Sequence, residues 1–143
     1  MYKNILLPLD LNARSSWKNA LPQAVELIRA SGGTLHVMTV VPDMGTPLVE
    51  SFFPQDFEEK AVAAASDALN RLVVENVPEG IKVKQHLGFG KIHKKVLAAI
   101  DETKADLVMM GAPVPNRVRE FLVGSNADRI VSRSPVSVLV VRA

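Results

Sequence analysis

The chain contains no cysteine among its 143 residues. That absence excludes disulfide bonds, thiolate metal centres, Cys-x-x-Cys redox chemistry and a cysteine nucleophile. A domain of this length buries about two-thirds of the surface that its unfolded chain exposes, so it can form a core without such cross-links. We therefore expect a single domain over residues 1–143. Cysteine-free composition is also compatible with a reducing compartment, and we expect a cytoplasmic protein.

Aromatic residues are scarce as well, with five phenylalanines, one tyrosine and one tryptophan. The 17 Lys and Arg residues nearly balance the 15 Asp and Glu residues, and they are scattered along the chain. Nucleic-acid-binding proteins usually concentrate basic residues in a stripe with aromatic side chains among them. The composition therefore predicts no nucleic-acid partner.

Long hydrophobic runs are missing too. The first apolar run, NILLPL at residues 4–9, is short and leads into Asp10, which is unlike a signal peptide or an anchor. No segment approaches the roughly 18 consecutive apolar residues of a membrane helix. We expect no membrane association.

What the sequence does contain is a regular alternation of strand-like and helix-like segments. Continuous or alternating apolar runs predict strands, and apolar residues at helical spacing predict helices. The predicted strands cover residues 4–9, 34–41, 81–87, 107–110 and 136–141, and the predicted helices cover 17–30, 55–74, 91–103 and 125–132. Pro22 indicates a kink or a later start of the first helix, and Gly88-Phe89-Gly90 is predicted to be a turn. The alternation predicts an α/β fold, with a parallel sheet and helices on both of its faces.

In such sheets ligands bind beyond the carboxyl ends of the strands, where the strand order reverses. Asp10 follows the first strand directly. Its carboxylate could accept a hydrogen bond from a ribose or an adenine amine, or hold a metal ion. Equally, Asp10 could cap the first helix. The sequence leaves both roles open.

A second candidate is Gly124-Ser125-Asn126, which opens the last predicted helix. Helix N-termini present unpaired N–H groups that favour anions, and a glycine lets a phosphate approach the backbone. The alternative is that Ser125 or Asn126 is an ordinary N-cap. The chain has no Walker loop, no Gly-x-Gly-x-x-Gly fingerprint, no Gly-x-Ser-x-Gly elbow and no His-Glu-x-x-His motif.

These segments together resemble the universal stress protein family. The segment DLVMMGAPVPNRVREFLVGSNADRIVSRSPVSVLVVR carries Gly111 and, at the family's distance, Gly124-Ser125. The opening YKNILLPLD and the segment GFGKIHKKVLAAI are similar to the family's first strand and to its turn before a helix. The resemblance covers nearly the whole chain and is more specific than any one motif.

The resemblance implies an open five-stranded sheet in the order 3-2-1-4-5, of the Rossmann-like adenine-nucleotide alpha-hydrolase type. It implies an ATP site, with or without Mg²⁺, in which Asp10 lies at the adenine and ribose side and Val40 offers its backbone to the adenine. Gly111 would border the ribose and phosphates, and residues 124–126 would hold the phosphates. The full set of implied binding residues is Pro8, Leu9, Asp10, Val40, Met110, Gly111, Val114, Gly124, Ser125 and Asn126. Val40 could instead be an ordinary core residue.

One position departs from the family pattern. Val114, between Pro113 and Pro115, stands where the pattern has a second glycine, and a side chain there disfavours a positive φ. Two functions therefore stay open: an ATP-binding regulatory dimer in stress response, and a dimeric interaction module whose loop excludes the nucleotide. No catalytic residue is identified, so we expect at most slow ATP hydrolysis. A true enzyme of the same fold would need a phosphate loop after the first strand, and residues 11–14 contain no glycine.

The last strand, Val136–Val141, is apolar on both faces and would form an edge of the sheet. An exposed apolar edge promotes association unless something covers it, and in the family the strand pairs with its copy. We expect a homodimer through this strand, with shielding by residues 48–54 or by a chain terminus as the alternative. The three histidines lack metal-ligand spacing; we expect His36 and His86 to be structural and His93 to be solvated.

Overall fold

The computed structural model describes residues 1–42, 56–111 and 125–142. In these residues it contains a five-stranded sheet in the order β3-β2-β1-β4-β5, and every neighbouring pair is parallel. The strands are β1 (Asn4–Pro8), β2 (Thr34–Pro42), β3 (Lys82–Gly90), β4 (Leu107–Gly111) and β5 (Ser137–Val141). The helices are a 3-10 turn η1 (Arg14–Ser16), α1 (Ala20–Ser31), α3 (Phe57–Asn76), α4 (Ile92–Thr103) and α5 (Ser125–Arg133).

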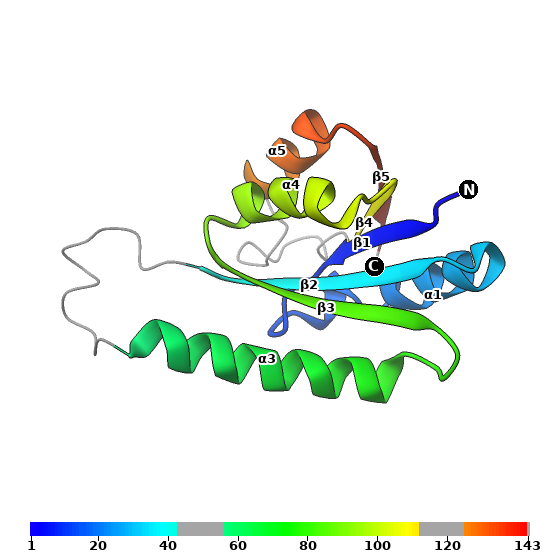
Figure 1. Ribbon diagram of the computed structural model, residues 1–143. Coiled ribbons are helices and arrows are strands. Elements are labelled where there is room, and N and C mark those ends of the chain that lie inside the picture. The colour runs from blue at the N-terminus through cyan, green and yellow to red at the C-terminus, as the bar shows by residue number, and fades with distance from the viewer. Residues whose placement is uncertain (43–55, 112–124, 143) are drawn as a thin grey trace.

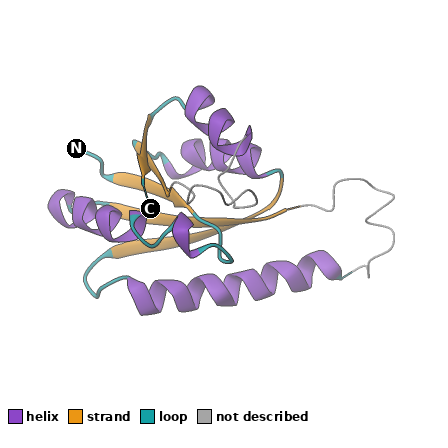
Figure 2. Cartoon of the chain, turned by 180° about the vertical axis from the view of Figure 1, so that it is seen from behind, coloured by secondary structure: helices purple, strands orange, loops and turns teal. Residues whose placement is uncertain are grey.

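The sheet lies between two layers of helices, α4 and α5 on one face and α1 and α3 on the other (Figure 1). The view from behind shows the same three layers (Figure 2). The fold predicted from the sequence, including the strand order 3-2-1-4-5, is confirmed.

The continuous apolar run of β1 is explained by burial on both faces. Ile5 and Leu7 belong to the core beneath α1 and α3, whereas Leu6 belongs to the core beneath α4 and α5. All three side chains are 0% exposed. Neither strand face meets water, so the usual alternation of polar and apolar residues is absent.

The first helix begins later than its apolar spacing suggests. The pattern starts at Trp17, but α1 begins at Ala20, after the turn η1. This start places Pro22 in the first turn of α1, where a backbone N–H has no partner within the helix. The helix ends at Ser31 and is followed by the C-cap Gly32, whose φ of 71° lies in the left-handed region that favours glycine.

The turn predicted at Gly88-Phe89-Gly90 is wrong. These residues continue β3 and pair with Val40, Val41 and Pro42 of β2. Because β2 runs nine residues, it offers a hydrogen-bonding partner along the whole of β3. Glycines weaken a strand but do not end it when such a partner is present.

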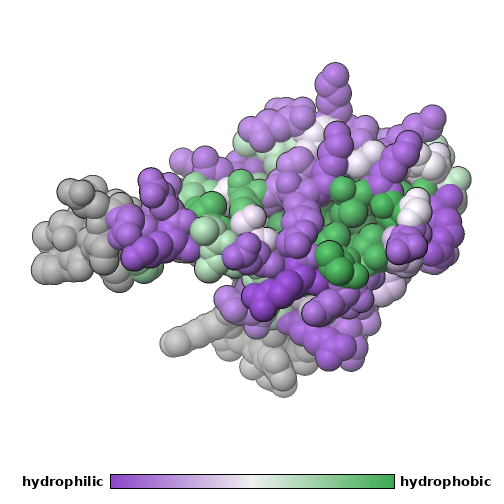
Figure 3. All heavy atoms as spheres, turned by 60° about the horizontal axis from the view of Figure 1, so that its bottom comes forward, coloured by the Kyte–Doolittle hydropathy of each residue, from purple (hydrophilic) through white to green (hydrophobic). Residues whose placement is uncertain are grey.

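The helix α3 is long and only partly covered by the sheet. Of its 20 residues, those that are buried are Leu69, Leu72 and Val73, all in its second half. Figure 3 looks towards the side of α1 and α3 and shows hydrophobic surface between the polar side chains. The part of α3 before Leu69 extends beyond these buried residues and is available to form the wall of a pocket. None of the described helices is long and apolar enough to span a bilayer.

At the amino-terminal end of the sheet, hydrogen bonds join the starts of β1 and β4, which are far apart in the sequence. The Asp106 carboxylate accepts hydrogen bonds from the backbone N–H groups of Lys3 (2.9 Å) and Asn4 (3.1 Å). Beside them, Gly33 lies so close to Lys3 that a Cβ atom there would be 2.0 Å from the Lys3 carbonyl oxygen. This end leaves little space between the backbone segments.

Candidate functional site

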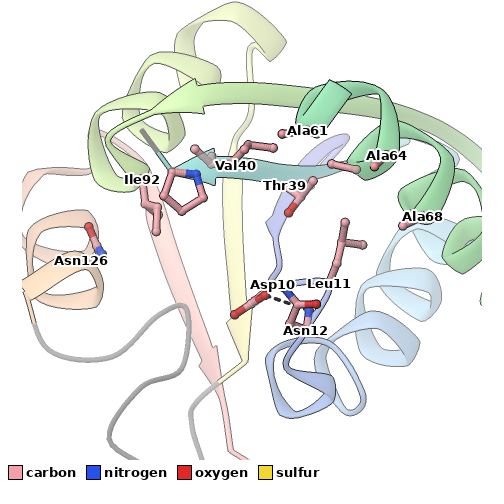
Figure 4. Close-up of a pocket in the computed structure, with 13 residues that line it drawn as sticks. Asp10, Leu11, Asn12, Thr39, Val40, Ala61, Ala64, Ala68, Ile92 and Asn126 are labelled. Atoms are coloured by element: carbon pink, nitrogen blue, oxygen red, sulfur yellow. Dashed lines mark hydrogen bonds between the residues drawn. The ribbon is translucent and has the colours of Figure 1, made fainter. Parts of the chain in front are cut away.

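The carboxyl end of the sheet opens into a pocket of about 620 Å³. This volume is within the range of small-molecule sites, roughly 300–1,000 Å³. The pocket is bounded by the loop after β1, the end of β2, residues 61–68 of α3, and the starts of α4 and α5 (Figure 4). Its lining residues are Asp10, Leu11, Asn12, Thr39, Val40, Val41, Pro42, Ala61, Ala64, Ala65, Ala68, Ile92 and Asn126.

Asp10 lies just after the carboxyl end of β1, and its carboxylate accepts a hydrogen bond from within its own loop. One carboxylate oxygen accepts a hydrogen bond from the backbone N–H of Asn12 at 2.9 Å (Figure 4). This is the Asx turn that aspartate forms readily with the residue two positions on. The alternative role of Asp10 as a helix cap is wrong, because the residues at the N-caps of η1 and α1 are Ala13 and Asn19.

The backbone around Asp10 is held by Ser16. The buried Ser16 hydroxyl accepts from Asp10 N–H at 2.9 Å and contacts the carbonyl oxygens of Asp10 at 3.1 Å and Ala13 at 2.6 Å. A hydroxyl has two lone pairs and one proton, so it can accept from the Asp10 N–H while it donates to one of the two carbonyl oxygens at a time. The loop that presents Asp10 is therefore fixed from behind by a residue that sequence reasoning missed.

The second side of the pocket is the end of β2. Thr39 is 4% exposed, and its hydroxyl donates to the Leu9 carbonyl at 3.0 Å, while Leu9 N–H donates to the Met38 carbonyl at 2.8 Å. These bonds tie the end of β1 to β2. Val40, one residue further, is 5% exposed and lines the pocket while also belonging to the core under α4 and α5.

The third side combines the first turns of α4 and α5. Asn126 is the second residue of α5 and lines the pocket, so the positive end of that helix dipole lies at the pocket. The side-chain oxygen of Asn126 lies 3.3 Å from Nδ1 of His93 on α4. His93 was expected to be solvated; this expectation is wrong, since His93 is 6% exposed.

The residues that the sequence nominated fall into three groups. Asp10, Val40 and Asn126 line the pocket, whereas Pro8, Leu9, Met110 and Gly111 are buried beside it and do not. Val114 and Gly124 lie outside the described residues, and Ser125 begins α5 with its side chain also outside the description.

Gly111 has a packing reason of its own. A Cβ atom at this position would lie 2.4 Å from the Ser16 carbonyl oxygen and 2.7 Å from that of Ser15. Such distances are impossible for a real side chain, so a glycine is needed where β4 passes the turn η1. This packing requirement accounts for the residue whether or not a ligand lies near it.

Sequence reasoning missed the wall formed by α3. Ala61, Ala64, Ala65 and Ala68 follow the helical spacing of the helix predicted over residues 55–74, and in the structure they line the pocket. Four small residues on one helical face, without large ones among them, are the signal that could have indicated a surface shaped for a ligand.

The pocket has a simple electrostatic character. Among the lining residues that the structure describes, Asp10 carries the one ionisable side chain. The described ranges contain no group of three or more His, Asp or Glu side chains that could hold a metal ion. The arrangement is suited to binding through hydrogen bonds and apolar contacts, because it combines the Asp10 carboxylate, the Asn126 amide at a helix N-terminus and the apolar alanine side chains of α3.

The parallel sheet, with a pocket at its carboxyl end, defines an α/β protein of the open, doubly wound class. Within this class the chain belongs to the universal stress protein family, whose family model matches residues 1–142. Universal stress protein G of Escherichia coli O157:H7 is 29% identical over 144 residues, covering 99% of this chain and 100% of that one. The structure of universal stress protein UspA from Lactobacillus plantarum aligns with a TM-score of 0.72 and 24% identity, over 99% and 98% of the two chains.

Two similar structures contain adenine nucleotides. One is a universal stress protein in complex with cAMP, with a TM-score of 0.64 and 22% identity over 99% of this chain and 97% of that one. The other is a family protein from Arabidopsis thaliana with AMP bound, with a TM-score of 0.61 and 13% identity over 98% and 91%. At these identities the likeness shows that the fold is shared.

Proposed function

We propose that this chain binds ATP in the pocket at the carboxyl ends of β1 and β2, and that it acts as a regulatory homodimer in the cytoplasmic stress response. The observation that carries the proposal is the pocket itself. It places the Asp10 carboxylate and the N-terminal turn of α5 on either side of a space of about 620 Å³. The adenine nucleotides in the two similar structures support the same ligand class.

The proposed pose follows from the chemistry of the three sides. A carboxylate accepts hydrogen bonds from hydroxyl groups, so Asp10 suits the ribose. The apolar end of β2, with Val40, and the alanines of α3 suit the flat adenine ring. The α5 N-terminus, with Ser125 and Asn126, suits the phosphates, because its N–H groups and dipole favour negative charge.

The remaining proposed contacts come from residues already nominated. Pro8, Leu9, Met110 and Gly111 would support the site from behind, while Val114 and Gly124 would border the phosphates. Mg²⁺ would be bound through the phosphates and water, since Mg²⁺ usually keeps several water ligands and needs few protein ones. Binding, and not turnover, is the proposed role: of the described lining side chains Asp10 alone is ionisable, and it is assigned to the ribose and not to the phosphates.

The proposal is tested by denaturing the purified protein, assaying the supernatant for adenine nucleotide, and titrating ATP by calorimetry. The affinity for ATP should fall at least about tenfold in Ala65→Phe, because the phenyl ring would occupy space in the pocket. The matched control is Ala63→Phe. Ala63 is exposed, does not line the pocket, and lies about 200° around the helix from Ala65.

Two results would contradict this function. No heat up to millimolar ATP, with no co-purified nucleotide, would favour the interaction module that lacks a nucleotide. Equal loss of affinity in Ala63→Phe and Ala65→Phe would place the site elsewhere.

The proposed dimer rests on the edge strand β5. Leu139 and Val140 are 41% and 40% exposed, on opposite faces of this strand. Large apolar side chains on an edge strand favour pairing with another chain, and a twofold axis would pair β5 with its own copy. Light scattering should give a dimer for the wild type and a monomer or aggregate for Leu139→Asp. Val74→Asp, at a residue 71% exposed on α3, should remain dimeric; a dimeric Leu139→Asp would exclude pairing through β5.

A further inference from the structure

His93 is a buried polar side chain for which the proposed function has no role. It lies in the first turn of α4, is 6% exposed, and does not line the pocket. Its neighbour Ile92 lines the pocket, as does its hydrogen-bond partner Asn126. His93 thus stands directly behind a pocket residue, joining the first turns of α4 and α5.

The hydrogen bond between them determines which end of the Asn126 amide is available. A carboxamide has an oxygen that accepts and a nitrogen that donates two hydrogen bonds. Nδ1 of His93 faces the oxygen at 3.3 Å, so Nδ1 must carry the proton and donate. The –NH₂ group of Asn126 is then the end left to serve the pocket. Without His93 the amide could rotate and present its oxygen, which repels an anion.

We propose that His93 is a positioning residue that holds Asn126 with its amide donor towards the phosphate part of the ligand, and so makes the pocket prefer phosphorylated nucleotides over the nucleoside. This inference rests on the proposed function, because it assigns a role within the same pocket. Figure 4 shows Asn126 on α5, on the opposite side of the pocket from Ala61, Ala64 and Ala68 on α3. A donor fixed there would act on the end of the ligand away from the alanine wall.

The test compares ATP with adenosine in calorimetric titrations. His93→Phe keeps a buried ring but removes the donor, and it should weaken ATP binding about tenfold, the size expected for one hydrogen bond to a charged group. Adenosine affinity should change by less than about twofold in the same variant. His93→Asn should restore ATP binding, since the amide nitrogen of asparagine occupies nearly the position of Nδ1. His86→Phe, the same substitution outside the pocket, is the matched control and should leave both affinities unchanged.

A second variant separates positioning from a general effect on the fold. In an Asn126→Ala background, His93→Phe should cause no further loss of ATP affinity, because the side chain that it positions is gone. Additive losses, an equal loss for ATP and adenosine, or a His93→Asn variant as weak as His93→Phe would each overturn the proposal.

The orientation can also be read without any ligand. In ¹⁵N-labelled wild-type protein, NMR should show that the ring nitrogen of His93 bonded to a proton is Nδ1. A proton on Nε2 alone would overturn the proposal. If wild-type protein binds neither ATP nor adenosine, the proposed function fails and the role of His93 fails with it. If the wild type binds ATP and His93→Phe binds it equally well, the proposed function stands and only the role proposed for His93 is wrong.

Discussion

The two ends of the sheet use the same kind of residue in opposite ways. At the amino end, both carboxylate oxygens of Asp106 accept backbone N–H groups, from Lys3 and Asn4. At the carboxyl end, Asp10 uses one carboxylate oxygen to accept the N–H of Asn12, and it lines the pocket. Both are aspartates beside a buried parallel strand. The comparison indicates that a carboxylate whose two oxygens both accept backbone N–H groups closes an end of the sheet, whereas one that also lines a pocket can serve a ligand.

The largest effect should come from the closed end. In Gly33→Ala the new Cβ would lie 2.0 Å from the Lys3 carbonyl oxygen, so β1 and the start of β2 must separate. We expect a loss of about 3 kcal/mol in the free energy of unfolding, measured by urea denaturation. The adjacent control is Gly32→Ala, where φ is 71° and no atom lies within 4 Å of the Cβ position. That variant should lose only about 1 kcal/mol, from the left-handed backbone; equal losses would show that the close approach is unimportant.

The two aspartates should separate stability from binding. Asp106→Asn replaces an acceptor with a donor that faces a backbone N–H, and we expect it to cost about 1 kcal/mol of stability without changing ATP affinity. Asp10→Asn keeps an oxygen for the Asn12 N–H, so its stability should hardly change. Its affinity for ATP and for adenosine should fall together, about tenfold, because both ligands share the ribose. Loss of ATP affinity in Asp106→Asn of the same size would remove the distinction between the two ends.

The same comparison shows how far sequence reasoning reaches. The strands and their parallel arrangement follow from local patterns, such as the doubly buried apolar run of β1, whereas the strand order was implied by the family resemblance. Sequence reasoning also placed Asp10 at the carboxyl end of the sheet, where the structure has a pocket, because topology alone brings Asp10 near β2. What could not be predicted depends on contacts between distant segments. The role of Ser16 behind Asp10, the alanine wall of α3 and the burial of His93 against Asn126 arise only when the layers are assembled. Gly88 and Gly90 illustrate the same limit, because their strand is stabilised by the length of β2.

The smallest effect should be a pH dependence of stability from a histidine pair in the amino half of the sheet. Nε2 of His36 lies 3.2 Å from the Asn4 side-chain oxygen, and Nδ1 of His36 lies 2.8 Å from Nε2 of His86. If Nε2 of His36 donates to Asn4, its Nδ1 accepts from His86, and both rings are neutral. Burial is the main cause that lowers the pKa of His36, followed by the charges of His86 and Lys84. Burial also lowers the pKa of His86; Lys84 adds to this effect, and Glu102 opposes it.

Both folded-state pKa values therefore lie below the ordinary histidine value of 6.5. Below pH 6.5 the unfolded chain binds more protons than the folded one, so the stabilisation is complete above this pH and is lost as the pH falls. His86→Gln keeps a donor near the position of Nε2 but cannot become charged, so its urea midpoint should fall less than that of the wild type between pH 7.5 and pH 5. The measurement is the difference between the two pH profiles, which cancels the carboxylates common to both proteins. If the urea midpoints of the two proteins fall in parallel with pH, the histidine pair takes up protons without disturbing β2 and β3. The amino end of the sheet would then be less tightly closed than its geometry indicates.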